Sequence, residues 1–134
     1  MHQDFDSLST IIYASKKDRW SYPKTFQALV DAGVASYEVK LDKYQAEYRG
    51  NFGSWFEPAP EGLSNLTINT EFDKNAFING LKDHIAGKTT YVQWLAHSAK
   101  AGVARYVVNM ADRTVTYYGI NSNDFHVEHV PQIS

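Results

Sequence analysis

The sequence predicts an α+β domain, an antiparallel sheet of about six strands with its helices packed on one face. Three observations favour this class. The chain carries an internal repeat, each copy contains two segments with the period of an amphipathic helix, and each copy continues with segments that alternate as half-buried strands do. The predicted single domain spans residues 1–134, with copy one at about 4–56, a linker at about 57–70 and copy two at about 71–130.

The repeat aligns residues 22–56 with residues 91–125 at a constant offset of 69 and without a gap. We interpret it as the duplication and divergence of one unit. Two separate halves of about 65 residues would each be marginally stable, so the copies are expected to share one core. Ten of the 35 aligned positions are identical: Tyr22/Tyr91, Ala32/Ala101, Gly33/Gly102, Val34/Val103, Ala35/Ala104, Tyr37/Tyr106, Val39/Val108, Tyr48/Tyr117, Gly50/Gly119 and Phe56/Phe125.

Each copy is expected to begin with an amphipathic helix. Asp4 or Asp6 is the expected N-cap in copy one, and Asp73 starts the equivalent helix in copy two. Gly87 stands where a left-handed residue would end that second helix. The apolar stripes have helical spacing and consist of Leu8, Ile11, Ile12 and Ser15 in copy one, and of Phe77, Leu81 and Ile85 in copy two.

The next helix of each copy has clearer ends. Ser21 and Thr90 occupy equivalent positions and are both suitable N-caps. Gly33 and Gly102 follow the last helical turn and are each followed by valine, a pattern that suits a Schellman motif. The repeated Ala-Gly-Val therefore has a structural explanation that requires no functional role.

After each glycine the apolar period changes to two, which predicts strands. Tight turns are expected at Asp42-Lys43 and Ala111-Asp112. The linker could add a short strand at 66–68. The irregular segment from Gly50 to Asn69 is of the kind that often carries function, and it is explained at least as well as a linker left over from the duplication. The predicted strands cover residues 37–41, 44–48 and the region of Trp55 and Phe56 in copy one, and 106–110, 115–117 and 125–130 in copy two.

Composition narrows the classes of function. The formal net charge is −2, so neither a nucleic-acid partner nor an anionic membrane surface is expected. The chain has no cysteine, which excludes disulfides and thiol chemistry. No signal peptide and no long apolar segment is visible, so a cytoplasmic location is expected. The expected partner is another protein or a second copy of the chain.

No catalytic or cofactor motif is present, and neither catalytic nor cofactor-binding residues are predicted. The chain is therefore more simply explained as non-catalytic. His126 and Glu128 would share one face of a strand, and His84 or His97 could complete a metal site with them only through the fold. Two ligands are too few for a zinc site, so His126, Glu128 and His97 are weak metal candidates and are better explained as surface polar groups.

Carboxylates and aromatic side chains offer further candidates. Glu38 and Glu47 could face each other on the wet side of neighbouring strands as an acid–base pair, although pairing with nearby lysine and arginine explains them better. Four tyrosines retained in both copies share a face with the buried valines and are expected in the core. They are Tyr37, Tyr106, Tyr48 and Tyr117. Phe52, Trp55 and Tyr118 are the expected exposed aromatic surface, which suits a protein interface.

The repeated Gly-Val-x-x-Tyr-x-Val and the Tyr-Tyr-Gly ending carry a resemblance to a known family. Residues 102–108 and 115–119, within matching stretches at 22–49 and 77–119, resemble the YbcV/YdfO-like group of small enterobacterial and prophage proteins. That group is often labelled "phage envelope protein", and its function is unknown. The resemblance implies a phage or prophage setting, and it supplies no catalytic residues.

Two functions fit these observations. The first is a non-catalytic protein-interaction module, favoured by the aromatic content and by the pseudo-symmetric surface that a duplicated unit presents. The alternative is a small-ligand-binding protein or an enzyme, with a pocket between the two copies or beneath the linker at 50–69.

Overall fold

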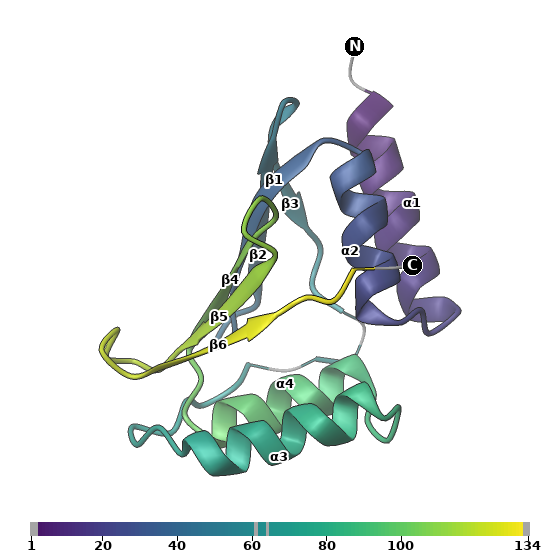
Figure 1. Cartoon of the computed structure of the whole chain (residues 1–134). Helices are drawn as coiled ribbons and strands as arrows, with labels where there is room; N and C mark the ends of the chain where they lie inside the picture. The colour runs from purple at the N-terminus through teal and green to yellow at the C-terminus, as the bar shows by residue number, and fades with distance from the viewer. Residues whose placement is uncertain (1–2, 61, 64, 133–134) are drawn as a thin grey trace.

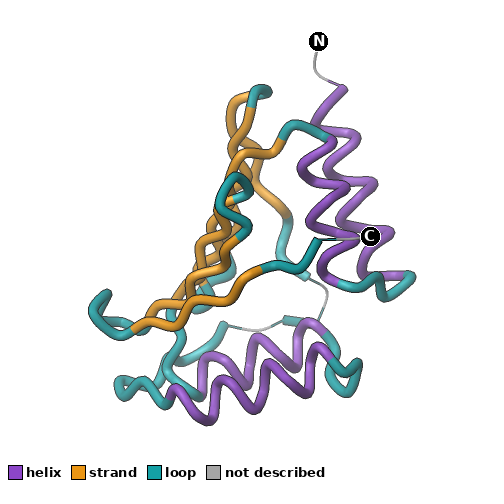
Figure 2. The backbone as a smooth tube through the Cα atoms, viewed as in Figure 1, coloured by secondary structure: helices purple, strands orange, loops and turns teal. Residues whose placement is uncertain are grey.

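The computed structural model is an α+β domain, as the sequence predicts. Among the described residues, six strands form one antiparallel sheet and four helices pack against one side of it (Figure 1). The structure describes residues 3–60, 62–63 and 65–132, with side-chain surroundings from residue 8 onward. The helices form two pairs, and the members of each pair lie side by side (Figure 2).

The element order of the first half returns in the second half. Helices α1 (Gln3–Lys17) and α2 (Tyr22–Asp31) precede three strands, and so do α3 (Lys74–Ile85) and α4 (Tyr91–Lys100). The sheet order is β3-β2-β1-β4-β5-β6, which places the first strand of each half at the centre. The strands are β1 (Val34–Lys40), β2 (Gln45–Gly50), β3 (Gly53–Glu57), β4 (Arg105–Asn109), β5 (Thr114–Tyr118) and β6 (Phe125–His129).

The two central strands pair symmetrically. Tyr37 lies opposite Val108 and Val39 lies opposite Tyr106, which are pairs of residues that the offset of 69 interchanges. The local two-fold axis that relates the two strands passes through the pair Glu38 and Val107. The halves therefore share one continuous sheet, while the duplication itself stays an interpretation of the sequence.

The constant offset fails at the outer strands. Ala46 pairs with Glu57, whereas its counterpart Val115 pairs with Glu128, so the offset there is 128 − 57 = 71. Phe125 is therefore not the structural counterpart of Phe56, and the ungapped alignment was wrong at this pair. The physical reason is that residues 119–124 connect β5 to β6 by a longer loop than residues 51–52 provide between β2 and β3.

The helix ends follow the sequence in part. Thr90 forms a full capping box with Gln93, and Asp73 accepts a hydrogen bond of 3.0 Å from the backbone N–H of Ala76. Ser21 has the extended backbone of an N-cap, but its side chain makes no capping hydrogen bond.

Helix α1 already includes Asp4 and Asp6, so the prediction that one of them caps it was wrong. Its first residue is Gln3, which precedes both aspartates.

Both helix-ending glycines have the predicted left-handed backbone, with φ of 97° at Gly33 and at Gly102. In the second half the Schellman pattern is complete. The Gly102 N–H donates to the Ala99 carbonyl at 3.0 Å and the Val103 N–H donates to the Ser98 carbonyl at 2.9 Å.

The described residues of the linker contain no strand at 66–68, so that prediction was wrong. The Leu66 N–H donates instead to the Asp42 carbonyl at 2.9 Å, and Leu66 and Ile68 pack against the core. Apolar side chains hold this segment without the continuous hydrogen-bonded ladder that a strand requires.

Candidate functional site

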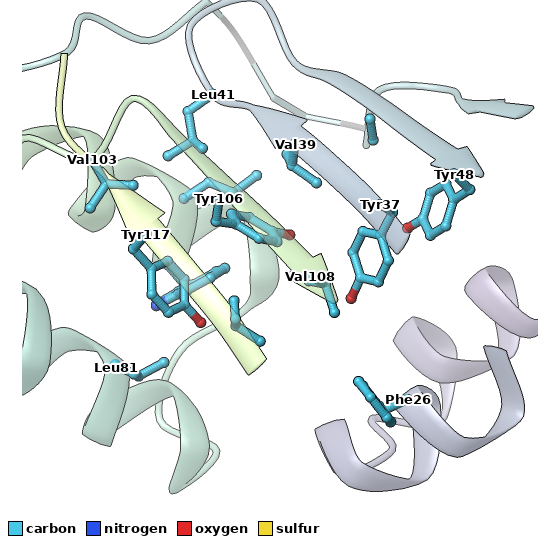
Figure 3. Close-up of a cluster of buried hydrophobic side chains, with 14 of the residues drawn as sticks. Phe26, Tyr37, Val39, Leu41, Tyr48, Leu81, Val103, Tyr106, Val108 and Tyr117 are labelled. Atoms are coloured by element: carbon cyan, nitrogen blue, oxygen red, sulfur yellow. The ribbon is translucent and has the colours of Figure 1, made fainter. Parts of the chain in front are cut away.

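The four repeated tyrosines of the strands point from the sheet into the region between the two helix pairs (Figure 3). Tyr37, Tyr48, Tyr106 and Tyr117 are each at most 7% exposed. They share the inner face with Val39 and Val108, because alternate residues of a strand face the same side. The prediction that these tyrosines belong to the core is confirmed.

Each half adds a tyrosine from the first residue of a helix. The Tyr22 hydroxyl bonds to the Tyr37 hydroxyl, and the Tyr91 hydroxyl bonds to the Tyr106 hydroxyl at 2.8 Å. Tyr22 keeps 38% of its surface exposed, although its hydroxyl turns inward. We call the seven inward-facing residues the tyrosine cluster: Tyr22, Tyr37, Tyr44, Tyr48, Tyr91, Tyr106 and Tyr117.

Glu57, at the end of β3, is the charged centre of this region. Its side chain is only 4% exposed. Its Oε1 accepts a hydrogen bond from the Tyr48 hydroxyl at 2.7 Å, and its Oε2 accepts one from the Tyr44 hydroxyl at 3.1 Å. The ammonium of Lys16 on α1 lies 2.6 Å from the same Oε2. A buried carboxylate needs such partners, since burying an unpaired charge is costly.

The hydroxyls form a directed chain across the two halves. The Tyr44 and Tyr91 hydroxyl oxygens lie 3.2 Å apart. Each phenol hydroxyl has one proton to donate, and the Tyr44 hydroxyl donates its proton to Glu57. The Tyr91 hydroxyl therefore donates to Tyr44, and the Tyr106 hydroxyl donates to Tyr91. Successive donation polarises such a chain and strengthens its bonds. The carboxylate of the first half is thereby linked to a strand of the second half.

Burial raises the pKa of every hydroxyl in the tyrosine cluster well above its usual range. The charges of neighbouring groups add to this effect, and at Tyr48 the Glu57 carboxylate is the first of them. The phenols are therefore neutral near pH 7. They can donate and accept hydrogen bonds, but they cannot act as phenolate bases or nucleophiles.

The three weak metal candidates do not assemble. His126 and Glu128 are in contact, while His97 lies exposed on α4. No three histidine, aspartate or glutamate side chains in the described part of the chain lie together as ligands would.

The structure places His84, the other histidine that could complete a metal site, against Trp94 of α4. Its ring stacks on Trp94 with centroids 5.0 Å apart, and its Nδ1 lies 3.0 Å from the Thr89 hydroxyl. Burial lowers the pKa of this imidazole.

The outer face of the sheet is not covered by the helices (Figure 1). Glu38 and Glu47 pair directly across β1 and β2, as the sequence suggested. Each carboxylate also has an arginine, with Arg105 at 3.1 Å from Glu38 and Arg49 at 3.0 Å from Glu47. They are charge-paired surface residues, and the contact with Arg105 was not predicted.

The exposed aromatic surface differs from the one expected. Phe52 and Trp55 are half-buried and pack against the core, so the expectation that they form a free surface was wrong, and the exposed aromatic of β3 is Phe56. Trp55 lies on the inner face because it shares the alternation of Glu57. Tyr118 does lie on the outer face, beneath the Arg105 guanidinium at 4.0 Å. The outer apolar patch of the second half consists of Val107, Thr116, Tyr118, Phe125 and Val127.

An open polar hollow lies just before α3, lined by residues between 69 and 75. The lining comes from one continuous segment, and its polar side chains are already bonded. The Asn69 side chain accepts from the Glu71 N–H at 3.0 Å and donates to the Lys100 carbonyl at 3.0 Å, and Asp73 caps the helix. This hollow brings together no groups from distant parts of the chain, unlike the tyrosine cluster.

The tyrosine cluster does bring together groups from distant parts of the chain. Its charged partners, Glu57 and Lys16, were not expected there from the sequence. Glu57 stands at the start of the predicted linker, and Lys16 directly follows the apolar stripe that ends at Ser15 in the first predicted helix. The available signal was the alternation of β3, which carries on to Glu57 and turns it inward with Trp55.

Fold and site together define a class: an α+β domain with a hydroxyl-rich interior and a buried glutamate that is paired with a lysine reaching it from the surface. None of the described helices has the length and apolar character that a membrane crossing requires. The chain belongs to DUF1398, a family of proteins of unknown function, whose match covers residues 10–129.

Relatives in mycobacteria are likewise uncharacterized. The chain is 29% identical over 108 residues to an uncharacterized protein of Mycobacterium bovis and to one of Mycobacterium tuberculosis. Each match covers 81% of this chain and 65% of the relative, so the relatives are longer than the matched part. The phage envelope label is not among these names and stays an expectation from sequence resemblance.

Proposed function

We propose that this protein binds a small ligand at the tyrosine cluster, between its two halves, without transforming it. The observation that supports this proposal best is the donor chain from Tyr106 through Tyr91 and Tyr44 to the buried carboxylate of Glu57. Ligand sites are largely apolar and carry a few convergent polar groups, which is the composition of this region.

Packing alone does not explain the choice of residues. Phenylalanine would fill the same space without a hydroxyl, and each buried hydroxyl costs stability unless it is bonded. The cluster also meets the surface in two places, at Tyr22, which is 38% exposed, and at Lys16, whose side chain is 36% exposed. Polar groups that lie inside the domain yet communicate with solvent suit recognition of a small molecule.

A thermal-shift screen against common metabolites tests this function. A compound that binds only the native state raises the melting temperature. We expect such a compound to act on the wild type and on Tyr13→Phe, whose ring is 67% exposed, but not on Tyr91→Phe. A flat screen, or equal shifts in all three proteins, would count against the tyrosine cluster as the binding site.

A protein-interaction role is the second candidate, and a specific observation favours it. The outer apolar patch is uncovered, with Phe125 49% and Val127 37% exposed. Exposed contiguous apolar surface often marks a protein contact. A phage or prophage setting for such a partner rests on sequence resemblance alone.

Sedimentation of the purified protein at rising concentration tests self-association through this patch. We expect Val127→Lys to lower any association, whereas Ser54→Lys, on the exposed surface of β3, should leave it unchanged. Association that persists in Val127→Lys would exclude the patch.

A further inference from the structure

We propose that the surroundings of Glu57 form a binding site for the primary ammonium group of a small organic amine, and that Lys16 occupies this site from within the chain. The inference names a ligand class for the proposed function and rests on it. It is carried by the position of one cation between a buried carboxylate and an aromatic ring.

The Lys16 ammonium makes the contacts that a bound ammonium ligand would make. Its Nζ lies 2.6 Å from Glu57 Oε2 and 4.6 Å from the centre of the Tyr91 ring. A carboxylate provides a charge-assisted hydrogen bond, and an aromatic face attracts a cation through its quadrupole. Tyr44 joins the two features, because its hydroxyl donates to the same Oε2 and bonds to Tyr91.

The groups around the ammonium are selective for a cation. Two hydroxyls, those of Tyr44 and Tyr48, hold the carboxylate in place. With the lysine side chain withdrawn, the region would retain a buried negative charge that requires compensation. Phosphate, carboxylate and other anions would be repelled there. An ammonium meets the requirement, and a neutral alcohol of the same shape does not.

Lys16 can be exchanged for a ligand because it reaches the site from the surface. Its side chain is 36% exposed, so the path from solvent to Glu57 is no longer than one lysine side chain. Among residues 8–17 of α1, Leu8 is fully buried and Ile11 and Ile12 pack half-buried against the core, so residues other than Lys16 make the apolar contacts of this part of the helix.

The second half does not repeat the arrangement. Glu128, the register counterpart of Glu57, contacts His126 of its own strand. The offset of 69 places Ile85, which is 72% exposed, at the position of Lys16. A cation supplied by a helix is therefore a feature of the first half, and general packing of the fold does not require it.

Truncation of the lysine followed by addition of the missing atoms tests the proposal. Lys16→Ala removes three methylene groups and the ammonium, which together correspond to n-propylammonium. We expect n-propylammonium to raise the melting temperature of this variant in a dose-dependent manner, with an affinity about tenfold or more above that for the wild type, where Lys16 competes. The neutral isostere 1-propanol and sodium chloride at equal ionic strength should have no such effect.

Two further variants locate the effect. Lys17→Ala, the neighbouring lysine, should respond to n-propylammonium only as the wild type does. The double variant Lys16→Ala, Glu57→Gln should lose the response. Lys16→Met keeps an apolar stem that reaches as far as Cε, with sulfur in place of Cδ, and lacks the ammonium group, so ammonium ion should stabilise it more than sodium does. Lys16→Met takes the place of Lys16→Ala in the test if Lys16→Ala does not fold in buffer.

The outcomes separate this inference from the proposed function. Equal shifts with 1-propanol, a response that survives Glu57→Gln, or no response in either Lys16 variant would overturn the ammonium site. If the metabolite screen still gives a ligand that depends on Tyr91, the proposed function stands with a different ligand class. If the screen is also flat, both fail.

Discussion

Glu57 and Glu128 occupy matching positions on the two outermost strands of the sheet. Glu57 pairs with Ala46 and Glu128 pairs with Val115. Burial raises the pKa of the repeated tyrosine on each neighbouring strand, Tyr48 or Tyr117, and the negative charge of the carboxylate adds to that rise. Their surroundings differ, because the Glu57 side chain is 4% exposed and the Glu128 side chain is 39% exposed.

This difference predicts unequal costs when the two charges are removed. Glu57→Gln leaves the Lys16 ammonium without its carboxylate and disturbs two tyrosine hydrogen bonds, so it should lower the free energy of unfolding by about 2–4 kcal/mol. Glu128→Gln should cost less than about 1 kcal/mol, since its contact with His126 is partly solvated. Urea unfolding of both variants measures the costs, and equal losses would contradict the buried role of Glu57.

The tyrosine cluster predicts instability in alkali. Its seven phenols have folded-state pKa values above the unfolded value of about 10, so the unfolded chain loses protons first as the pH rises. The stability they contribute is complete below about pH 10 and is lost above it, by up to about 1.4 kcal/mol per pH unit for each tyrosine.

The predicted loss of stability in alkali is checked by following the ultraviolet absorbance of phenolate together with circular dichroism. Seven of the nine tyrosines belong to the tyrosine cluster. Most of the phenolate signal should appear with the loss of structure. A smooth titration of the whole set in a folded protein would show that the cluster is open to hydroxide.

The two helix-ending glycines should differ in their tolerance of a side chain. At Gly102 an added Cβ would lie 2.3 Å from the Glu71 carbonyl oxygen and 2.7 Å from the Phe72 Cα, neither of which can move freely. At Gly33 the nearest atom, at 2.5 Å, belongs to the flexible side chain of Asn51.

We therefore expect Gly33→Ala to cost about 1–2 kcal/mol from the left-handed backbone alone, and Gly102→Ala or Gly102→Val to cost more. Thermal or urea unfolding compares them. The double variant Gly33→Ala, Asn51→Ala should be no less stable than Gly33→Ala, because it removes the side-chain atoms that would lie nearest to the added Cβ. Equal costs at both glycines would mean that the backbone at residues 71–72 yields.

The fold was predictable because each of its signals is local. Alternation around Tyr37 and Val39 identifies the inner face of β1, and a glycine with positive φ ends each of α2 and α4. The outer strands were less predictable. The offset between the halves increases by two residues at Glu128 because the loop between β5 and β6 is longer, and an alignment without gaps cannot show this change.

The candidate site was not predictable, because it depends on contacts between segments far apart in the chain. Lys16 and Glu57 are separated by 41 positions, and Tyr44 and Tyr91 by 47. Each of these residues, taken alone, has an ordinary explanation as a helix-end cation, a linker charge or a core aromatic. Only the packing of both helix pairs on one face of the sheet brings their polar atoms together.

The last prediction concerns acid. Burial against Trp94 lowers the pKa of His84 below 6.5, and the positive charge of Arg19 acts in the same direction, while the hydrogen bond to Thr89 opposes both. The unfolded chain therefore binds a proton at a higher pH than the folded chain does. The contribution of His84 to stability is complete above about pH 6.5 and is lost as the pH falls through the folded-state value.

Urea midpoints measured between about pH 7 and pH 5 should fall in the wild type and less steeply in His84→Gln. His129→Gln, altered at an exposed histidine of β6, should follow the wild type. Parallel curves for all three proteins would show that other groups set the acid limit.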